Sequence, residues 1–388
     1  MEEIKNLRKV AERIKRAIKD KERIILYADA DLDGTASLLI LEEAIKNLGG
    51  EVSAVYFPDR QKEGYGLSRK ALSFLKKYSP ALLILLDCGI SNFDEIEKAN
   101  KMDFEVIVID HHKVLGKLPK ASIIVDPKQK GDKYSFKELC TAALSYYLSE
   151  SILGNKLQGL LKQSFLELVA IATLADMMVE KEDNKNFVRK GISTLFESFR
   201  PGIKIFSEIS LEKPNSEREL AFRIVSNLSA GEVRDHLTDI YRILKENDLE
   251  TVEILAKDLM EKNIRKHQEI ERITQEIKER LEEKGEEEIV FEGDSSWPVA
   301  FLGPVATKIQ SIFRKPTFIY FRGNKESRGA VRVPKGVDSV EAMRNCDKFL
   351  KTYGGHPPAS GFSIKNENLL NFKDCLVKYF SKNECKKP

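Results

Sequence analysis

The sequence predicts an α/β fold whose larger part is a doubly wound parallel sheet. Over residues 1–195, short apolar runs alternate with stretches of helical periodicity. Such runs are typical of strands that are buried on both faces of a sheet. A long charged helical pattern and a second, smaller α/β pattern follow. We therefore expect three parts, which cover residues 1–195, 196–285 and 286–388.

The first part contains the elements of a repeated strand–helix–strand pattern. Its predicted strands are 24–27, 52–57, 82–86, 106–109 and 123–125, and its predicted helices are 2–19, 35–48, 67–77, 92–100, 136–151 and 161–175. Strands that alternate with helices form parallel sheets with helices on both faces.

The second and third parts differ from the first in pattern. Residues 249–284 carry charges at nearly every turn and apolar residues at helical spacing, which predicts one amphipathic helix of roughly 50 Å. A packing helix and a rigid connector both fit this pattern, and we favour the connector. The third part is predicted to be a small α/β domain. Its predicted strands are 288–291, 316–321 and 329–333, with a helix at 305–313 and a glycine-rich segment at 354–362.

Composition limits the class of protein. The 388 residues carry a net charge of +3, which is too small to indicate a polyanionic partner by itself. No apolar run of about 18 residues is present, and the charged N-terminus lacks the apolar core of a signal peptide. The five cysteines are scattered and form no C-x-x-C pair. We therefore expect reduced thiols in a cytoplasmic protein.

Acidic clusters directly follow three of the predicted strands. They read Asp29-Ala-Asp31-Leu-Asp33-Gly34, Asp87-Cys-Gly-Ile-Ser91 and Asp110-His111-His112. The carboxyl ends of parallel strands meet at one edge of the sheet, so these side chains should converge. Grouped carboxylates repel one another unless cations lie among them, which predicts a metal site. A further carboxylate, Asp176, lies in an apolar helical stretch, where it is costly unless it is paired or metal-bound.

Other interpretations of these residues stay open at this point. An EF-hand calcium loop would need Glu at its twelfth position, which is Ile40, and a helix rather than a strand before it. A phosphatase of the haloacid-dehalogenase type would use Asp31 as nucleophile and Asp33 as acid/base, but it leaves the two histidines without a role. His111 and His112 could be surface residues, and Asp176 could be a capping or ion-paired residue.

Taken in order, the motifs resemble those of the DHH/DHHA1 phosphoesterases. The order is D-x-D-x-D-G, D-C-G, D-H-H, a lone helical Asp, and finally G-G-H-x-x-A-x-G-F at Gly354–Phe362. Within this family, the segment 58–67 (PDRQKEGYGL) is similar to one in RecJ-type single-strand exonucleases, here of the shorter, archaeal kind. The resemblance implies a DHH metal-binding catalytic domain (1–195), a helical connector (196–285) and a DHHA1 substrate-binding domain (286–388).

The resemblance also implies the role of each site residue. Two divalent ions, Mn²⁺ by preference or Mg²⁺, would be held by Asp29, Asp31, Asp33, Asp87, His111 and Asp176, with Asp87 bridging them. His112 would face the scissile phosphate, and Asp110 would orient a histidine. Substrate would contact Arg60, Tyr65 and Gly66 in the first part and Arg328, Arg332, Gly354, Gly355 and His356 in the last.

The implied function is a two-metal phosphodiesterase that degrades single-stranded DNA or RNA to 5′-mononucleotides in DNA replication and repair. Replisome or helicase proteins are candidate partners, and no membrane is involved. Alternatives are an exonuclease for RNA 3′ ends or short oligoribonucleotides, a cyclic-dinucleotide phosphodiesterase, and a noncatalytic replication-fork scaffold. Two motifs depart from the family. The usual W-H-x-G-V reads Trp297-Pro298-Val-Ala-Phe, and P-R-I-N-A-A-G-R is replaced by the segment 223–231, which bears on strand preference and polarity.

Overall fold

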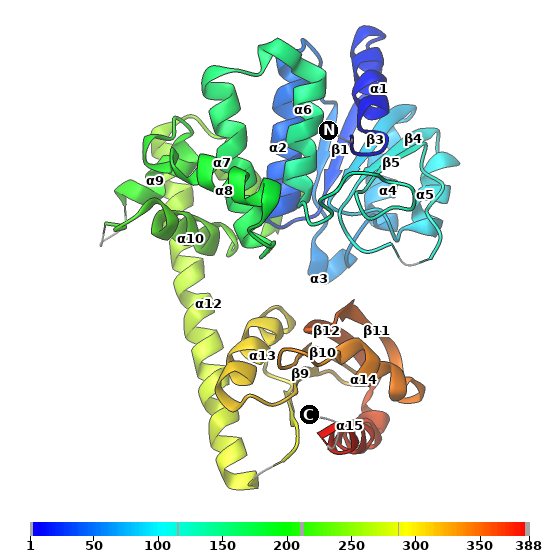
Figure 1. The fold of residues 1–388 in the computed structure, drawn as a ribbon, viewed down its shortest axis with the longest axis vertical. Helices are drawn as coiled ribbons and strands as arrows, with labels where there is room; N and C mark the ends of the chain where they lie inside the picture. The colour runs from blue at the N-terminus through cyan, green and yellow to red at the C-terminus, as the bar shows by residue number, and fades with distance from the viewer. Residues whose placement is uncertain (1–2, 115, 210–212, 286, 385–388) are drawn as a thin grey trace. The chain divides into compact units, whose positions relative to one another are not determined.

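The structure is a computed structural model that describes residues 3–114, 116–209, 213–285 and 287–384. It divides into two compact units, Met1–Asn263 and Ile264–Pro388 (Figure 1). Each unit has its own sheet and its own hydrophobic core, so each is described by itself.

The first unit is built on a five-stranded parallel sheet with strand order β2-β1-β3-β4-β5. The strands are β1 (Ile24–Ala28), β2 (Ala54–Tyr56), β3 (Ala81–Leu86), β4 (Phe104–Ile109) and β5 (Ile123–Val125). Every residue of β1 and β3 is buried, as the apolar runs predicted for strands covered on both faces.

Helices cover both faces of this sheet. Leu26 and Ala28 belong to a core shared with one set of helices, whereas Ile25 and Tyr27 belong to a core shared with another set. The first set is α1 (Leu7–Lys19), α2 (Leu32–Asn47), α6 (Thr141–Leu153) and α7 (Gly159–Ala175), and the second is α4 (Arg69–Leu75) and α5 (Phe93–Asn100). The predicted doubly wound architecture is confirmed.

Three neighbouring strands end in step, each just before an acidic residue. The backbone N–H groups of Asp29, Asp87 and Asp110 donate to the carbonyls of Leu86, Ile109 and Val125, at 3.2, 3.0 and 3.0 Å. Each acid therefore still pairs with the next strand, and adjacent strands lie roughly 4.8 Å apart. The sheet itself brings these carboxylates together.

Further helices and a short hairpin complete the first unit. They are α3 (Arg60–Glu63), α8 (Glu182–Ile192), α9 (Pro201–Glu208), α10 (Glu217–Leu228), β6 (Val233–Arg234), β7 (Leu237–Thr238) and α11 (Asp239–Lys245). The predicted long helix is α12 (Leu249–Lys284). Its residues Val252 and Leu259 belong to the core of the first unit, and Ile273 and Ile277 belong to a core of the second. One helix thus supplies apolar side chains to both units.

The second unit contains a mixed five-stranded sheet with strand order β11-β12-β10-β9-β8. Only the pair β8–β9 is parallel within this sheet. The strands are β8 (Val290–Asp294), β9 (Thr317–Arg322), β10 (Glu326–Arg332), β11 (Leu350–His356) and β12 (Ala359–Lys365), and the helices are α13 (Val299–Phe313), α14 (Ser339–Asn345) and α15 (Leu369–Glu384). The small α/β domain predicted here is confirmed in fold class.

The glycine-rich segment forms most of the β11–β12 hairpin. Gly355 has φ +133°, and a Cβ there would lie 2.6 Å from the Cα of Ser360 in the facing strand. A side chain has no room at that distance, so the close approach of the two strands requires glycine.

The cysteine prediction is wrong for one pair. Cys346 and Cys375, 29 residues apart in sequence, form a disulfide that joins the C-cap of α14 to α15. Cys88 and Cys140 are free and buried, and Cys385 lies outside the described residues. Spacing could not reveal the pair, because only the packing of α14 against α15 brings the two thiols together. Among the described helices, none is long and apolar enough to cross a membrane.

Gly34 lies in the first turn of α2 and packs against the backbone of Asp29, and its substitution should test this contact. A Cβ at Gly34 would lie 2.3 Å from the carbonyl oxygen of Asp29, so the loop must move. We expect Gly34→Ala to lower the free energy of unfolding by about 1–3 kcal/mol, as overpacking does. Gly354→Ala is the control, because a Cβ there meets nothing within 4 Å. Equal stability of the two variants in chemical denaturation would contradict this account.

Candidate metal centre

In the first acidic loop, carboxylates accept hydrogen bonds from nearby backbone N–H groups. Asp31 is the N-cap of α2, and its Oδ1 accepts the N–H of Gly34 at 3.0 Å. The Oδ1 of Asp29 accepts the N–H of Ala30 at 2.8 Å. Asp29 and Asp33 are buried, whereas the side chain of Asp31 is 41% exposed. The alternating spacing therefore spreads three carboxylates around the start of one helix.

Asp33 points toward the beginning of another helix. Its two carboxylate oxygens accept the backbone N–H groups of Thr141 and Ala142, each at 2.8 Å. These are the first residues of α6, so a carboxylate from a distant loop caps this helix and faces its positive end. The predicted helix 136–151 began five residues too early, because this tertiary cap cannot be read from local sequence.

Asp87 follows β3 in a strained conformation. Its φ is +59°, in the left-handed region that residues other than glycine seldom adopt. Its side chain is buried, and its Oδ1 accepts the hydroxyl of Thr141 at 3.1 Å. Thr141 also belongs to the site, which the sequence did not reveal. The residues around it in the sequence read as an ordinary apolar helix, and none of them indicates that its hydroxyl contacts a carboxylate.

Asp110 orders the two histidines that follow it. Its Oδ1 accepts the N–H groups of His111 and His112, at 2.8 and 3.1 Å, and lies 2.8 Å from Nδ1 of His112. Its Oδ2 accepts the N–H of Ile90 at 3.0 Å. Burial would raise the pKa of Asp110, but these bonds, above all that from His112, hold it at about 2. The contact to His112 fits the orienting role predicted for Asp110.

The ring of His111 faces three carboxylates. Its Nε2 lies 3.4 Å from Asp87 Oδ1, 3.5 Å from Asp176 Oδ2 and 3.9 Å from Asp33 Oδ2. Burial, and then the charge of His112, lowers the pKa of His111 to about 3, so its imidazole is neutral. A neutral imidazole is a ligand for divalent metals. Asp176 is the C-cap of α7, and not an interior residue of that helix.

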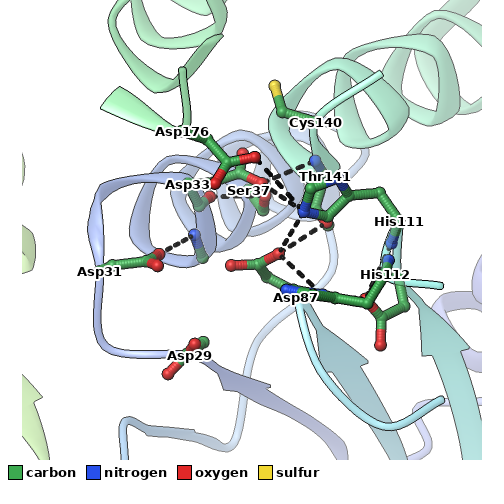
Figure 2. A network of polar contacts seen from close by, with 12 residues as sticks. Asp29, Asp31, Asp33, Ser37, Asp87, His111, His112, Cys140, Thr141 and Asp176 are labelled. Atoms are coloured by element: carbon green, nitrogen blue, oxygen red, sulfur yellow. Dashed lines mark hydrogen bonds and ion pairs between the residues drawn. The ribbon is translucent and has the colours of Figure 1, made fainter. Parts of the chain in front are cut away.

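The potential ligand atoms form overlapping sets that could each hold a cation (Figure 2). One set is Asp33, His111 and Asp176, another is Asp29, Asp31 and Asp87, and a further set is Asp87, His111 and His112; within each, the atoms lie within 4.8 Å of one another. Two ligands about 2.1 Å from one cation are roughly 3.0–3.5 Å apart at ordinary coordination angles. The distances around His111 are close to that separation, so the donor set fits divalent ions. Figure 2 shows Asp87 among the other carboxylates.

The carboxylates repel one another strongly. Burial, then the charge of Asp31, raises the pKa of Asp33 to about 6. Burial, then the charges of Asp33 and Asp31, raises the pKa of Asp176 to about 7, and burial with the same neighbours raises that of Asp87. Asp126 is buried directly after β5, and burial raises its pKa to about 7. Divalent cations would remove this repulsion.

Arg60 and Tyr65, both predicted to bind substrate, lie against the acidic cluster. The guanidinium of Arg60 forms ion pairs with Asp29 and Asp31, the latter at 2.8 Å. Burial would raise the pKa of Asp31, but this guanidinium lowers it. The hydroxyl of Tyr65 lies 3.0 Å from the carbonyl of Asp87 and 3.1 Å from Nδ1 of His112.

Two further residues near this cluster have structural contacts. Gly66, a predicted substrate contact, accepts the hydroxyl of Tyr27 with its carbonyl at 2.7 Å, and a Cβ there would meet Asn92 at 2.4 Å. Lys128, which the sequence did not reveal, donates from Nζ to the carbonyl of His111 at 2.7 Å. Only the fold brings Lys128 beside the two histidines, so no motif announces it.

The remaining predicted substrate residues share one sheet in the second unit. Arg332 on β10 and His356 on β11 both pair in register with Ala359 on β12, so they lie two strand spacings apart, roughly 10 Å. Arg328 lies four residues before Arg332 on β10, two pleat repeats away, and is exposed. The Nε of Arg332 donates to Thr307 Oγ1 at 3.1 Å, and burial lowers its pKa.

The raised carboxylate pKa values predict how stability depends on pH. An acid whose pKa is higher in the folded protein binds more protons there, so metal-free protein should lose stability as pH rises from about 4 to about 7. Asp176→Asn should flatten that loss and stabilise the protein at pH 8 by on the order of 1 kcal/mol, a value discounted because the side chain is 33% exposed. Denaturation in EDTA at several pH values measures this. The exposed Asp94→Asn is the control, and an Asp176→Asn slope equal to wild type would refute the repulsion.

Comparison with known proteins identifies the family. The model of the DHH family, N-terminal domain, matches residues 23–173, and that of the DHHA1 domain matches residues 287–382. The chain is 29% identical to the single-stranded-DNA-specific exonuclease RecJ of Bacillus subtilis over 96% of its length and 48% of that protein, and 27% identical to RecJ of Thermus thermophilus over 97% and 54%. It thus spans about half the length of these relatives.

Solved structures agree with this likeness. A crystal structure of exonuclease RecJ bound to manganese superposes with a TM-score of 0.80 at 25% identity, covering 98% of this chain and 95% of that one. RecJ of Thermus thermophilus in complex with Mn²⁺ gives 0.83 at 23% identity, covering 98% and 55%, which shows the common fold. With both family domains present in order and RecJ-like sequence along nearly its whole length, the chain belongs to the DHH/DHHA1 family.

Proposed function

We propose that this protein is a metal-dependent exonuclease of the RecJ type, which hydrolyses single strands to 5′-mononucleotides in DNA replication or repair. The observation that carries the proposal is the pair of ligand sets Asp33–His111–Asp176 and Asp29–Asp31–Asp87, set side by side at the strand ends. Two adjacent divalent ions are typical of enzymes that cleave phosphodiester bonds. The relatives from Bacillus subtilis and Thermus thermophilus are single-stranded-DNA-specific exonucleases.

Each ligand set would hold one ion, Mn²⁺ by preference or Mg²⁺. When bound, such ions supply a water of lowered pKa and charge that stabilises the phosphorane-like transition state. Asp87 would touch both ions, since its Oδ1 lies 3.4 Å from His111 Nε2 while the residue also groups with Asp29 and Asp31. Carboxylates mixed with one imidazole favour Mn²⁺ or Mg²⁺ over softer metals.

His112 would bind the scissile phosphate. Burial would lower its pKa, but the hydrogen bond to Asp110 and that residue's charge raise it to about 8. At neutral pH the ring therefore carries a proton that it can donate to a phosphate oxygen. Its position is fixed by Asp110 at 2.8 Å and Tyr65 at 3.1 Å, and its side chain is 36% exposed, so substrate can reach it.

The substrate would be held by phosphate contacts on both units. Arg60 and Tyr65 would act beside the metal ligands, and Arg328, Arg332, Gly354, Gly355 and His356 would bind phosphates from the β10–β12–β11 face. Single-stranded DNA is the proposed substrate on the likeness to RecJ. RNA as a second substrate, replisome or helicase partners, an archaeal source and a cytoplasmic location stay predictions.

One assay decides the proposed activity. Single-stranded DNA and RNA of the same sequence, labelled at the 5′ or the 3′ end, are incubated with the protein and Mn²⁺, Mg²⁺ or EDTA. We expect mononucleotide release from single strands with Mn²⁺, and none from a blunt duplex or in EDTA. Cleavage that continues in EDTA, or no cleavage of any single strand, would refute a metal-dependent single-strand exonuclease.

Asp87→Ala should abolish turnover. The substitution removes the carboxylate shared between the ligand sets, so it should lower Mn²⁺ affinity while leaving the fold intact. Calorimetric titration of Mn²⁺ and circular dichroism measure the two effects. Asp94→Ala, which removes an exposed carboxylate in the first turn of α5, should keep wild-type activity. An Asp87→Ala enzyme with wild-type rate in Mn²⁺ would end the bridging assignment.

Arg332→Ala should raise KM for single strands roughly ten-fold without changing Mn²⁺ affinity. A charge-assisted hydrogen bond to phosphate contributes about 1.5–3 kcal/mol, and loss of a ground-state contact appears in KM. Binding to wild type should weaken with salt, and more steeply than binding to the variant. The exposed Arg344→Ala, on α14, is the matched control. Unchanged affinity of Arg332→Ala for single strands would exclude this residue from the substrate path.

A further inference from the structure

A cavity of about 400 Å³ lies in the first unit, beside Asp31. Its size falls within the range of small-ligand sites, and it adjoins one of the two ligand sets. One wall comes from the acidic loop and α3, and the facing wall comes from the segment after α10. The charged lining residues are Asp31, Asp59, Arg60, Lys62 and Glu232.

In the facing wall, the backbone N–H groups of residues 229–232 are already occupied. Over residues 229–232 the four N–H groups donate in turn to Val225 O, Asn227 O, Leu228 O and Asp239 Oδ2. A turn that binds phosphate needs N–H groups free to point at it. This wall also begins where α10 ends, and the C-terminal end of a helix carries partial negative charge.

The charges that line the cavity also disfavour an anion. In the metal-free protein, three carboxylates, of Asp31, Asp59 and Glu232, stand against two cations, so the lining is negative by one charge. Both cations are already paired, Arg60 with Asp29 and Asp31 and Lys62 with Asp59 at 2.7 Å.

Glu232 is the carboxylate of the facing wall. It is 67% exposed and lies 3.9 Å from Arg234 and from Lys262. Those two cations also face Asp239 and Asp258, with Lys262 at 2.7 Å from each. Glu232 is therefore weakly neutralised and can accept a hydrogen bond from a ligand.

We propose that this cavity receives the terminal nucleoside of a strand whose end is a free hydroxyl, and that it discriminates against a terminal phosphate. A hydroxyl can donate to Glu232 and to the carbonyl end of α10, whereas a terminal phosphate carries about −1.5 to −2 charges and would meet an acidic wall. The inference rests on the proposed exonuclease function and specifies which strand ends that site accepts.

Four single-stranded DNAs of one sequence test it, with an internal label and each combination of hydroxyl or phosphate at the two ends. We expect a phosphate at one end, the end that is attacked, to lower kcat/KM at least ten-fold, and a phosphate at the other end to have no effect. The end at which a phosphate lowers kcat/KM shows whether the cavity binds the 3′ or the 5′ hydroxyl. Equal rates for all four, or faster cleavage with either phosphate, would overturn the proposal.

A binding measurement keeps the outcome separate from activity. Anisotropy titrations of the same four oligonucleotides in EDTA should show weaker binding when the one terminal phosphate is present. If no strand is cleaved, the proposed function fails, and equal affinities in this titration overturn the end preference independently.

Substitution of Glu232 assigns the effect to this cavity. Because the side chain is exposed, Glu232→Gln and Glu232→Arg should fold as wild type does. Glu232→Gln should bring the preference for the hydroxyl end toward unity, and Glu232→Arg should reverse it. Glu250→Arg makes the same charge reversal at an exposed site on α12 that does not line the cavity, and should keep the wild-type preference. A Glu232→Arg enzyme that still prefers the hydroxyl end would overturn the proposal.

Discussion

Mutual repulsion among buried carboxylates is the constraint on which the rest of the first unit depends. Asp33, Asp87 and Asp176 all have raised pKa values, because burial removes water and each faces the others. A protein that holds them together must fix them with rigid elements, since mobile side chains would separate. The end of β3 fixes Asp87, the first turn of α2 fixes Asp33, and the C-cap of α7 supplies Asp176.

The repulsion is contained by hydrogen bonds that come from distant parts of the chain. The beginning of α6 donates two N–H groups to Asp33, and the hydroxyl of Thr141 reaches Asp87. Asp110 behaves differently from its neighbours, because its oxygens are occupied by donors and its pKa is held at about 2. The same residue type therefore serves as structural acceptor in one place and as candidate ligand a few ångströms away.

In the cavity beside Asp31, the arrangement of charges bears on the substrate rather than on the metal. Of its cations, Arg60 pairs with the acidic loop and Lys62 pairs with Asp59. Its facing wall combines Glu232 with the carbonyl end of α10. The segment that departs from the RecJ pattern, 223–231, leads directly into this wall. Under the proposed end preference, a change in this segment alters which strand end is accepted and leaves the residues of the ligand sets unchanged.

The sequence by itself determined the parallel sheet, the long helix and the candidate ligand set, because strand periodicity places an acid at the end of each of three apolar runs. Through the family resemblance it also indicated His111 and Asp176 as metal ligands, and the structure groups both of them with Asp33. Only the tertiary structure decided the capping of α6 by Asp33, the contacts of Thr141 and Lys128, the Cys346–Cys375 disulfide and the cavity at Glu232. These join residues far apart in the chain, and local sequence carries no record of which surfaces will meet.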